Sequence, residues 1–111
     1  MPDDRALLMI AASETDSNLY YATRFIAPDP FVYLEVHGER LMVMSDLEMD
    51  RARSQAAVDR IISYSEVERA TRAQGVSDPG TIDIVHGILH PAGIKKLLVP
   101  SNFSYAYALR L

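Results

Sequence analysis

Apolar runs that alternate with polar, turn-forming clusters predict five β-strands along this chain of 111 residues. The runs span residues 6–12, 31–36, 41–44, 60–65 and 94–100. Only a short polar turn containing Gly38 separates the second run from the third, so these two are expected to pair as a β-hairpin. Pro28 and Pro30 stand just before the hairpin and force the residues that precede them towards an extended conformation.

Apolar residues at helical spacing occupy the intervals between the strands. The helical segments predicted in this way are 19–25, 46–58, 66–75, 79–90 and 105–111, the first being a short helix or turn. Ser45 and Ser65 each stand three residues before a glutamate, and this spacing predicts a capping box at the start of the second and third segments. Pro79 is expected in the first turn of the fourth segment, which ends at Pro91.

The order of these elements, in which strands alternate with helices, predicts an α/β fold. We expect a single three-layer domain over residues 1–111, in which helices flank a mixed sheet of about five strands. The last residue, Leu111, falls within an apolar helical pattern that has no C-cap and no polar tail. Such an ending is expected of a fragment of a longer protein.

Charge and cysteine usage narrow the classes of function. The net charge of -4 comes from 15 acidic and 11 basic residues, and no basic run is present, which argues against binding to nucleic acid or anionic membranes. The absence of cysteine excludes disulfides, thiolate zinc sites and cysteine nucleophiles, and is compatible with a reducing cytoplasm. The first apolar run is much shorter than the roughly 20 residues of a membrane-spanning helix. We therefore expect a cytoplasmic protein.

Two patterns resemble metal sites but lack required ligands. His86 and His90 are one helical turn apart, yet Gly87 stands where a zinc-hydrolase helix carries its glutamate, and no third ligand is evident. Residues 46–50 alternate carboxylates as a calcium loop does, but the glycine and the final glutamate of such a loop are missing. We interpret the histidines as ordinary helix-surface residues and the carboxylates as a negatively charged helix N-terminus. No metal ligand is assigned.

Three polar residues alternate along the first strand of the hairpin. Tyr33, Glu35 and His37 share one face, where Glu35 and His37 could form an acid–base pair in a cleft. A half-exposed strand face with polar residues has the same pattern, and we favour this second interpretation. The chain also has no G-x-S-x-G nucleophile motif and no glycine-rich phosphate loop. No catalytic residue is assigned.

Aromatic residues next to an arginine form the remaining candidate site. Tyr20, Tyr21, Arg24 and Phe25 could line the rim of a peptide-binding cleft, because rings supply contact area and a guanidinium pairs with carboxylates. Alternatively, Tyr21 and Phe25, four residues apart, are core anchors and Arg24 is solvated. Both interpretations stay open, with the core favoured for Phe25.

Four segments, taken in order, carry a resemblance to a known family. They are NLYYATRF at 18–25, PFVYLEVHGERLMVMSD at 30–46, LEMDRAR at 47–53 and GIKKLLVPSNFSYAYALRL at 93–111. In order and spacing they resemble the N-terminal domain of the creatinase, prolidase and Xaa-Pro aminopeptidase family, the M24 metallopeptidases. Arg24 stands where that family has glycine before the phenylalanine, so the resemblance does not carry over the tight turn that glycine allows.

The resemblance implies a creatinase N-terminal fold, ribonuclease H-like, and a non-catalytic role. In the family, a C-terminal half binds two divalent metal ions and acts on substrates such as short proline-containing peptides, while the N-terminal domain helps to form a homodimer and overhangs an active site. We therefore expect no cofactor in this chain, manganese, cobalt or zinc in its parent, and a catalytic domain as its partner. The four residues from Tyr20 to Phe25 become substrate-cleft candidates. The alternatives are a stand-alone homodimerising module, or a creatinase-like or metal-free parent.

Overall fold

A computed structural model describes residues 4–100 together with Phe103 and Tyr107, and its centre is a five-stranded sheet. The strands are β1 (Arg5–Ala11), β2 (Phe31–Val36), β3 (Glu39–Met44), β4 (Arg60–Ser63) and β5 (Lys96–Leu98), in the spatial order β4-β3-β2-β1-β5. β2 is antiparallel to both of its neighbours, whereas β4 is parallel to β3 and β5 is parallel to β1. The predicted mixed sheet and the hairpin are therefore confirmed.

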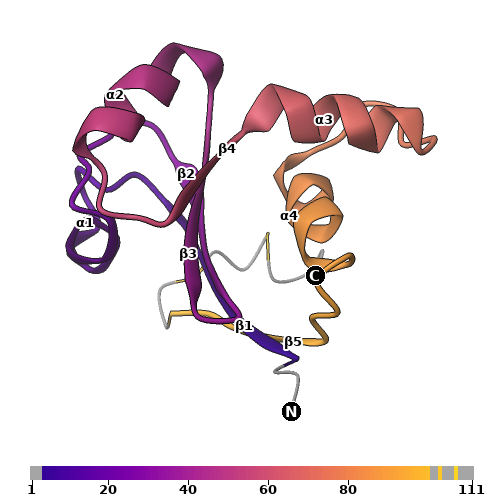
Figure 1. Ribbon diagram of the computed structural model, residues 1–111, viewed down its shortest axis with the longest axis horizontal. Helices are drawn as coiled ribbons and strands as arrows, with labels where there is room; N and C mark the ends of the chain where they lie inside the picture. The colour runs from indigo at the N-terminus through magenta and orange to yellow at the C-terminus, as the bar shows by residue number, and fades with distance from the viewer. Residues whose placement is uncertain (1–3, 101–102, 104–106, 108–111) are drawn as a thin grey trace.

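Helices cover both faces of the sheet (Figure 1). They are α1 (Ser17–Thr23), a 3-10 turn η1 (Asp46–Glu48), α2 (Met49–Gln55), α3 (Tyr64–Ala73) and α4 (Thr81–Leu89). α1 and α2 lie on one side of the sheet, and α3 and α4 lie on the other. This arrangement confirms the predicted three-layer α/β fold. The predicted segment 105–111 lies outside the described residues, apart from Tyr107.

Alternation along the strands divides the buried side chains into two cores, one on each face. Leu34 pairs in register with Leu8 and Leu41, and this row packs towards α4. The next residue, Tyr33, pairs with Met9 and Met42, and this row packs towards α1 and α2. The sheet is thus buried on both faces, as the near-continuous apolar runs of β2 and β3 require.

The helix starts differ from the predicted capping boxes. Ser63, not Ser65, is the N-cap of α3, because β4 runs directly into the helix and the Ser63 hydroxyl accepts the amide hydrogen of Glu66 at 3.3 Å. Ser45 makes no side-chain capping bond, since Glu48 pairs with Arg51 and α2 begins only after η1. Both predicted boxes were therefore wrong.

The C-terminal end of α2 and the start of α4 also differ from the prediction. α2 stops at Gln55, and the backbone amide of Ala57 instead donates to the Thr23 carbonyl at 2.7 Å, which ties the chain to α1. α4 begins at Thr81, where Asp83 accepts the amide hydrogen of Gly80 at 2.8 Å, so Pro79 precedes the helix instead of lying in its first turn. Within the described part of the chain, no helix has the length and apolar character needed to cross a membrane.

Candidate functional site

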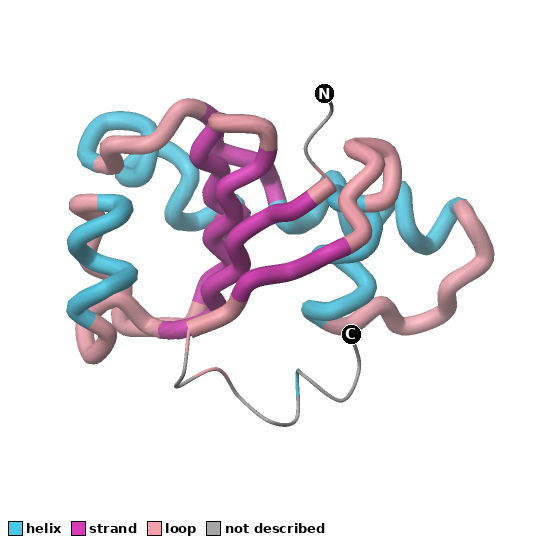
Figure 2. Tube along the Cα trace, turned by 90° about the horizontal axis from the view of Figure 1, so that it is seen from below, coloured by secondary structure: helices cyan, strands magenta, loops and turns pink. Residues whose placement is uncertain are grey.

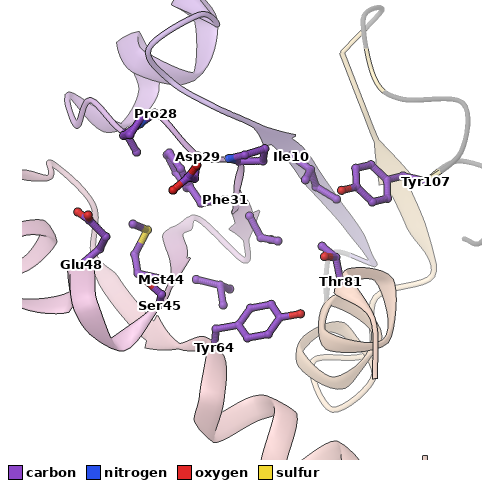
Figure 3. A pocket seen from close by; sticks show the side chains of 14 residues that line it. Ile10, Pro28, Asp29, Phe31, Met44, Ser45, Glu48, Tyr64, Thr81 and Tyr107 are labelled. Atoms are coloured by element: carbon purple, nitrogen blue, oxygen red, sulfur yellow. The ribbon is translucent and has the colours of Figure 1, made fainter. Parts of the chain in front are cut away.

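Figure 2 shows the sheet from below, and a cavity of about 320 Å³ opens at one end of it (Figure 3). β1, β3, β4 and β5 all run in the same direction, and the cavity lies where β1 and β3 end, where β2 begins and where α3 and α4 start. The carboxyl ends of parallel strands are the usual place for ligands in open α/β sheets, because the connecting loops diverge there. The cavity therefore lies at the edge of the sheet where ligands usually bind.

The wall of the cavity combines apolar strand ends with polar groups from loops and helix starts. Ile10, Phe31 and Met44 supply apolar surface, while Tyr64 and Thr81 bring hydroxyls from the first residues of α3 and α4. Figure 3 shows the acidic side chains of Asp29 and Glu48 on one side of the cavity. The hydroxyl-bearing side chains of Thr81 and Tyr107 lie on the other side. Mostly apolar surface with a few polar groups is typical of small-ligand sites.

The two acids of the wall are in different states of pairing. Glu48 Oε2 is 2.6 Å from Arg51 Nη2 and accepts a hydrogen bond from Arg51 Nε at 2.8 Å, and this charge-assisted contact offsets the charge of the carboxylate. Asp29 lies exposed between Pro28 and Pro30, and no described residue makes a hydrogen bond or ion pair with its side chain. Asp29 is therefore the acid of this cavity that remains available to a ligand.

The predicted cleft candidates divide between surface and core. The side chains of Tyr20 and Tyr21 are exposed, and the Arg24 guanidinium lies 4.5 Å from the centroid of the Tyr21 ring. Phe25 is completely buried, packs edge-on against Phe31 at 6.3 Å, and is therefore the core anchor that the sequence favoured. Tyr21, which is 72% exposed, is not a core anchor.

Arg24 forms a left-handed turn although it is not glycine. It caps the C-terminus of α1 in the left-handed conformation, with φ 55°, and its amide donates to the Tyr20 carbonyl at 2.6 Å. This conformation is unfavourable for residues other than glycine because the Cβ approaches the following carbonyl. The turn thus forms without a glycine, and the arginine side chain stacks on the exposed Tyr21 ring of α1.

The polar residues of the hairpin do not bond to each other as an acid–base pair. The Tyr33 hydroxyl donates to Glu35 Oε1 at 2.7 Å, and burial, followed by this bond, raises the pKa of Tyr33 well above its ordinary value. His37 Nε2 instead contacts the Ala92 carbonyl at 2.9 Å. Glu35 and His37 therefore have separate partners, which argues against an acid–base pair. The half-exposed strand face favoured from the sequence is wrong as well, because Tyr33 is completely buried in the core that faces α1 and α2.

Neither of the two patterns that resemble metal sites forms a metal site in the structure. His86 is exposed on α4 and His90 is exposed at its C-cap, while Asp46 accepts hydrogen bonds from the hydroxyls of Ser63 and Ser65 at 3.0 Å. Among the described residues, no group of three or more histidines, aspartates and glutamates is arranged to hold a metal ion. The residues described here therefore do not fit the two-metal centre that the resemblance implies for a parent protein.

The cavity itself was not predicted from the sequence. Asp29, Tyr64 and Thr81 come from three segments that are far apart along the chain and meet only when the sheet forms. The local signal that could have identified Asp29 is its position between two prolines, which hold an acidic side chain in a rigid loop.

Comparison with known proteins supports the fold through structure and not through sequence. No family model and no curated protein matches the sequence. An X-Pro aminopeptidase from Thermotoga maritima matches 96% of this chain with a TM-score of 0.68 and 14% identity. An Xaa-Pro aminopeptidase from Streptococcus thermophilus also matches 96%, with a TM-score of 0.65 and 20% identity, and a prolidase from Pyrococcus horikoshii matches 86%, with a TM-score of 0.51 and 16% identity.

The matched region is only part of most of these proteins. It spans 27% of the Thermotoga chain, 28% of the Pyrococcus chain and 68% of the Streptococcus chain. The resemblance found in the sequence is thereby confirmed at the level of the fold: this chain has the architecture of the creatinase N-terminal-like domain of Xaa-Pro aminopeptidases and prolidases.

Proposed function

We propose that this chain is the non-catalytic N-terminal domain of a two-metal peptidase similar to Xaa-Pro aminopeptidase or prolidase. The observation that carries the proposal is the asymmetry of coverage. An aminopeptidase fold matches 96% of this chain, while the match takes up only 27% of that aminopeptidase. The partner of this chain would then be the catalytic domain of the same protein.

The exposed part of α1 is the proposed contribution to the substrate cleft. Tyr20, Tyr21 and Arg24 present two rings and a guanidinium on one exposed segment, and the Arg24–Tyr21 contact fixes the position of the charge. Such a surface suits short peptides, since rings contact side chains and a guanidinium pairs with carboxylates. Phe25 supports this segment from the core and makes no contact with a substrate.

Homodimerisation is the second proposed contribution. Leu47 is 95% exposed in η1, and Ile26 is also largely exposed. Apolar side chains with this degree of exposure on a domain of this size are consistent with a surface that an assembled protein covers.

The divalent metals, manganese, cobalt or zinc, are proposed to belong to the catalytic domain. The described residues of this chain offer no set of ligands for them. In the parent, such metals would polarise the scissile carbonyl and generate the attacking hydroxide. The contribution of this chain is limited to shaping the cleft and the assembly.

The proposal is tested by assaying an Xaa-Pro dipeptide with the 111-residue chain and with the longer protein that contains it. We expect hydrolysis by the longer protein, dependent on manganese, cobalt or zinc and lost with a chelator, and no hydrolysis by the chain alone. Metal-dependent turnover by the chain alone, or a longer protein without such turnover, would contradict the proposal.

The role of Arg24 has its own test in the longer protein. Replacing Arg24 by Ala should change KM for several peptides if the residue lines the cleft, while the control Arg53→Ala, at an exposed position on α2, should leave KM unchanged. If KM for every peptide were the same in Arg24→Ala as in Arg53→Ala, Arg24 would be a solvated surface residue and not part of the cleft.

A further inference from the structure

Among the described residues that line the cavity at the carboxyl ends of the strands, all the formal charge is negative. Asp29 and Glu48 are acidic, and none of the other described lining residues is lysine, arginine or histidine. Arg51, which forms an ion pair with Glu48, is not among the described lining residues and makes no ion pair with Asp29. A concave surface with apolar walls and one sign of charge concentrates counter-ions, so it favours a cation over an anion.

The backbone around Asp29 is restricted, and its carboxylate is accessible to a cation. Pro28 and Pro30 restrict the backbone on both sides of it, so little conformational freedom remains to be lost on binding. Its carboxylate is exposed at the rim and has no partner among the described residues. A charged group from a ligand would therefore not have to displace an existing ion pair.

Aromatic and hydroxyl groups complete the surroundings. Phe31, Tyr64 and Tyr107 contribute rings to the wall, and the Tyr64 and Thr81 hydroxyls add neutral polar groups to it. Aromatic faces attract cations through the quadrupole of the ring, most strongly where water is excluded. A hydrated metal ion would gain little from these rings, whereas an organic cation would bury its carbon skeleton against them.

We propose that this cavity binds a small organic ammonium ion, with Asp29 as its counter-ion and with the carbon skeleton of the ligand packed against the aromatic and apolar wall. A cavity of about 320 Å³ is at the lower end of the range for small-ligand sites, which suits an amine with one ring or a short chain. The ammonium group can belong to a free amine or to the amino end of a peptide. The proposal does not rest on the proposed peptidase role, because residues of this chain alone form the cavity.

The test is a titration of the 111-residue chain, followed by NMR, with phenethylammonium, with 3-phenylpropionate and with the dipeptide Phe-Ala. We expect saturable shifts of amides around the cavity with phenethylammonium and none with 3-phenylpropionate, which has the same ring but the opposite charge. Shifts with Phe-Ala as well would assign the site to peptide amino ends, whereas shifts with the amine alone would assign it to free amines.

Two matched variants locate the counter-ion. Asp29→Asn removes a charge-assisted contact and should weaken binding of phenethylammonium about tenfold. Asp50→Asn removes the same charge from a fully exposed side chain on α2 outside the cavity wall and should leave the affinity unchanged. Equal affinity of the Asp29 variant and the wild type, or equal binding of 3-phenylpropionate, would overturn the proposal. Because no hydrolysis is measured, neither result bears on the peptidase role.

Discussion

Arg24 forms the left-handed turn after α1 at a cost in folding free energy. Its left-handed backbone, with φ 55°, is unfavourable for any residue with a Cβ, and glycine would adopt it without this penalty. Arg24→Gly should therefore raise the free energy of unfolding by about 0.5–1 kcal/mol, even after the entropy that glycine adds to the unfolded chain. Urea denaturation monitored by circular dichroism measures the change.

The same substitution elsewhere in the chain provides the control. Arg53 lies in α2, so Arg53→Gly should lower the free energy of unfolding by about 1 kcal/mol. Opposite signs for the two substitutions would show that backbone conformation decides the effect. A loss of stability in both would mean that the Arg24 contact with Tyr21 outweighs the backbone penalty.

At the scale of elements, local patterns predicted strands better than helix ends. β2 begins and ends at the predicted residues because two adjacent apolar runs with a turn between them have few alternatives. The start of α3 was misplaced by two residues because Ser63 and Ser65 are both plausible caps, and the strand that enters the helix decides between them. The cavity depends on contacts between distant segments, such as Ile10, Asp29 and Tyr64, so no local pattern could predict it.

The choice between the two serines can be measured. Ser63 caps α3 and also donates to Asp46 Oδ1 at 3.0 Å, whereas Ser65 bonds to Asp46 without capping the helix. Ser63→Ala should therefore lower the free energy of unfolding by about 1–2 kcal/mol, and Ser65→Ala by a smaller amount, in urea denaturation. A larger loss for Ser65→Ala would restore the capping box predicted from the sequence.

At the scale of the whole molecule, both cores depend on one sheet. Leu34 faces α4, while Met42, on the neighbouring strand, faces α1 and α2. The strands β2 and β3 contribute to both cores, so neither face can lose its packing without exposing the strands that support the other. The chain should therefore unfold as one cooperative unit, as small single domains usually do.

This dependence predicts that damage to either core is felt on both faces. Leu34→Ala and Met42→Ala should each lower the free energy of unfolding by about 2–5 kcal/mol, because each leaves a cavity in a fully buried site. Native-state hydrogen exchange should then show the same loss of protection for the slowest amides of α2 and of α4 in each variant. If Leu34→Ala lowered protection in α4 and left α2 unchanged, the two helix layers would be separate folding units, and the sheet would not couple the packing on its two faces.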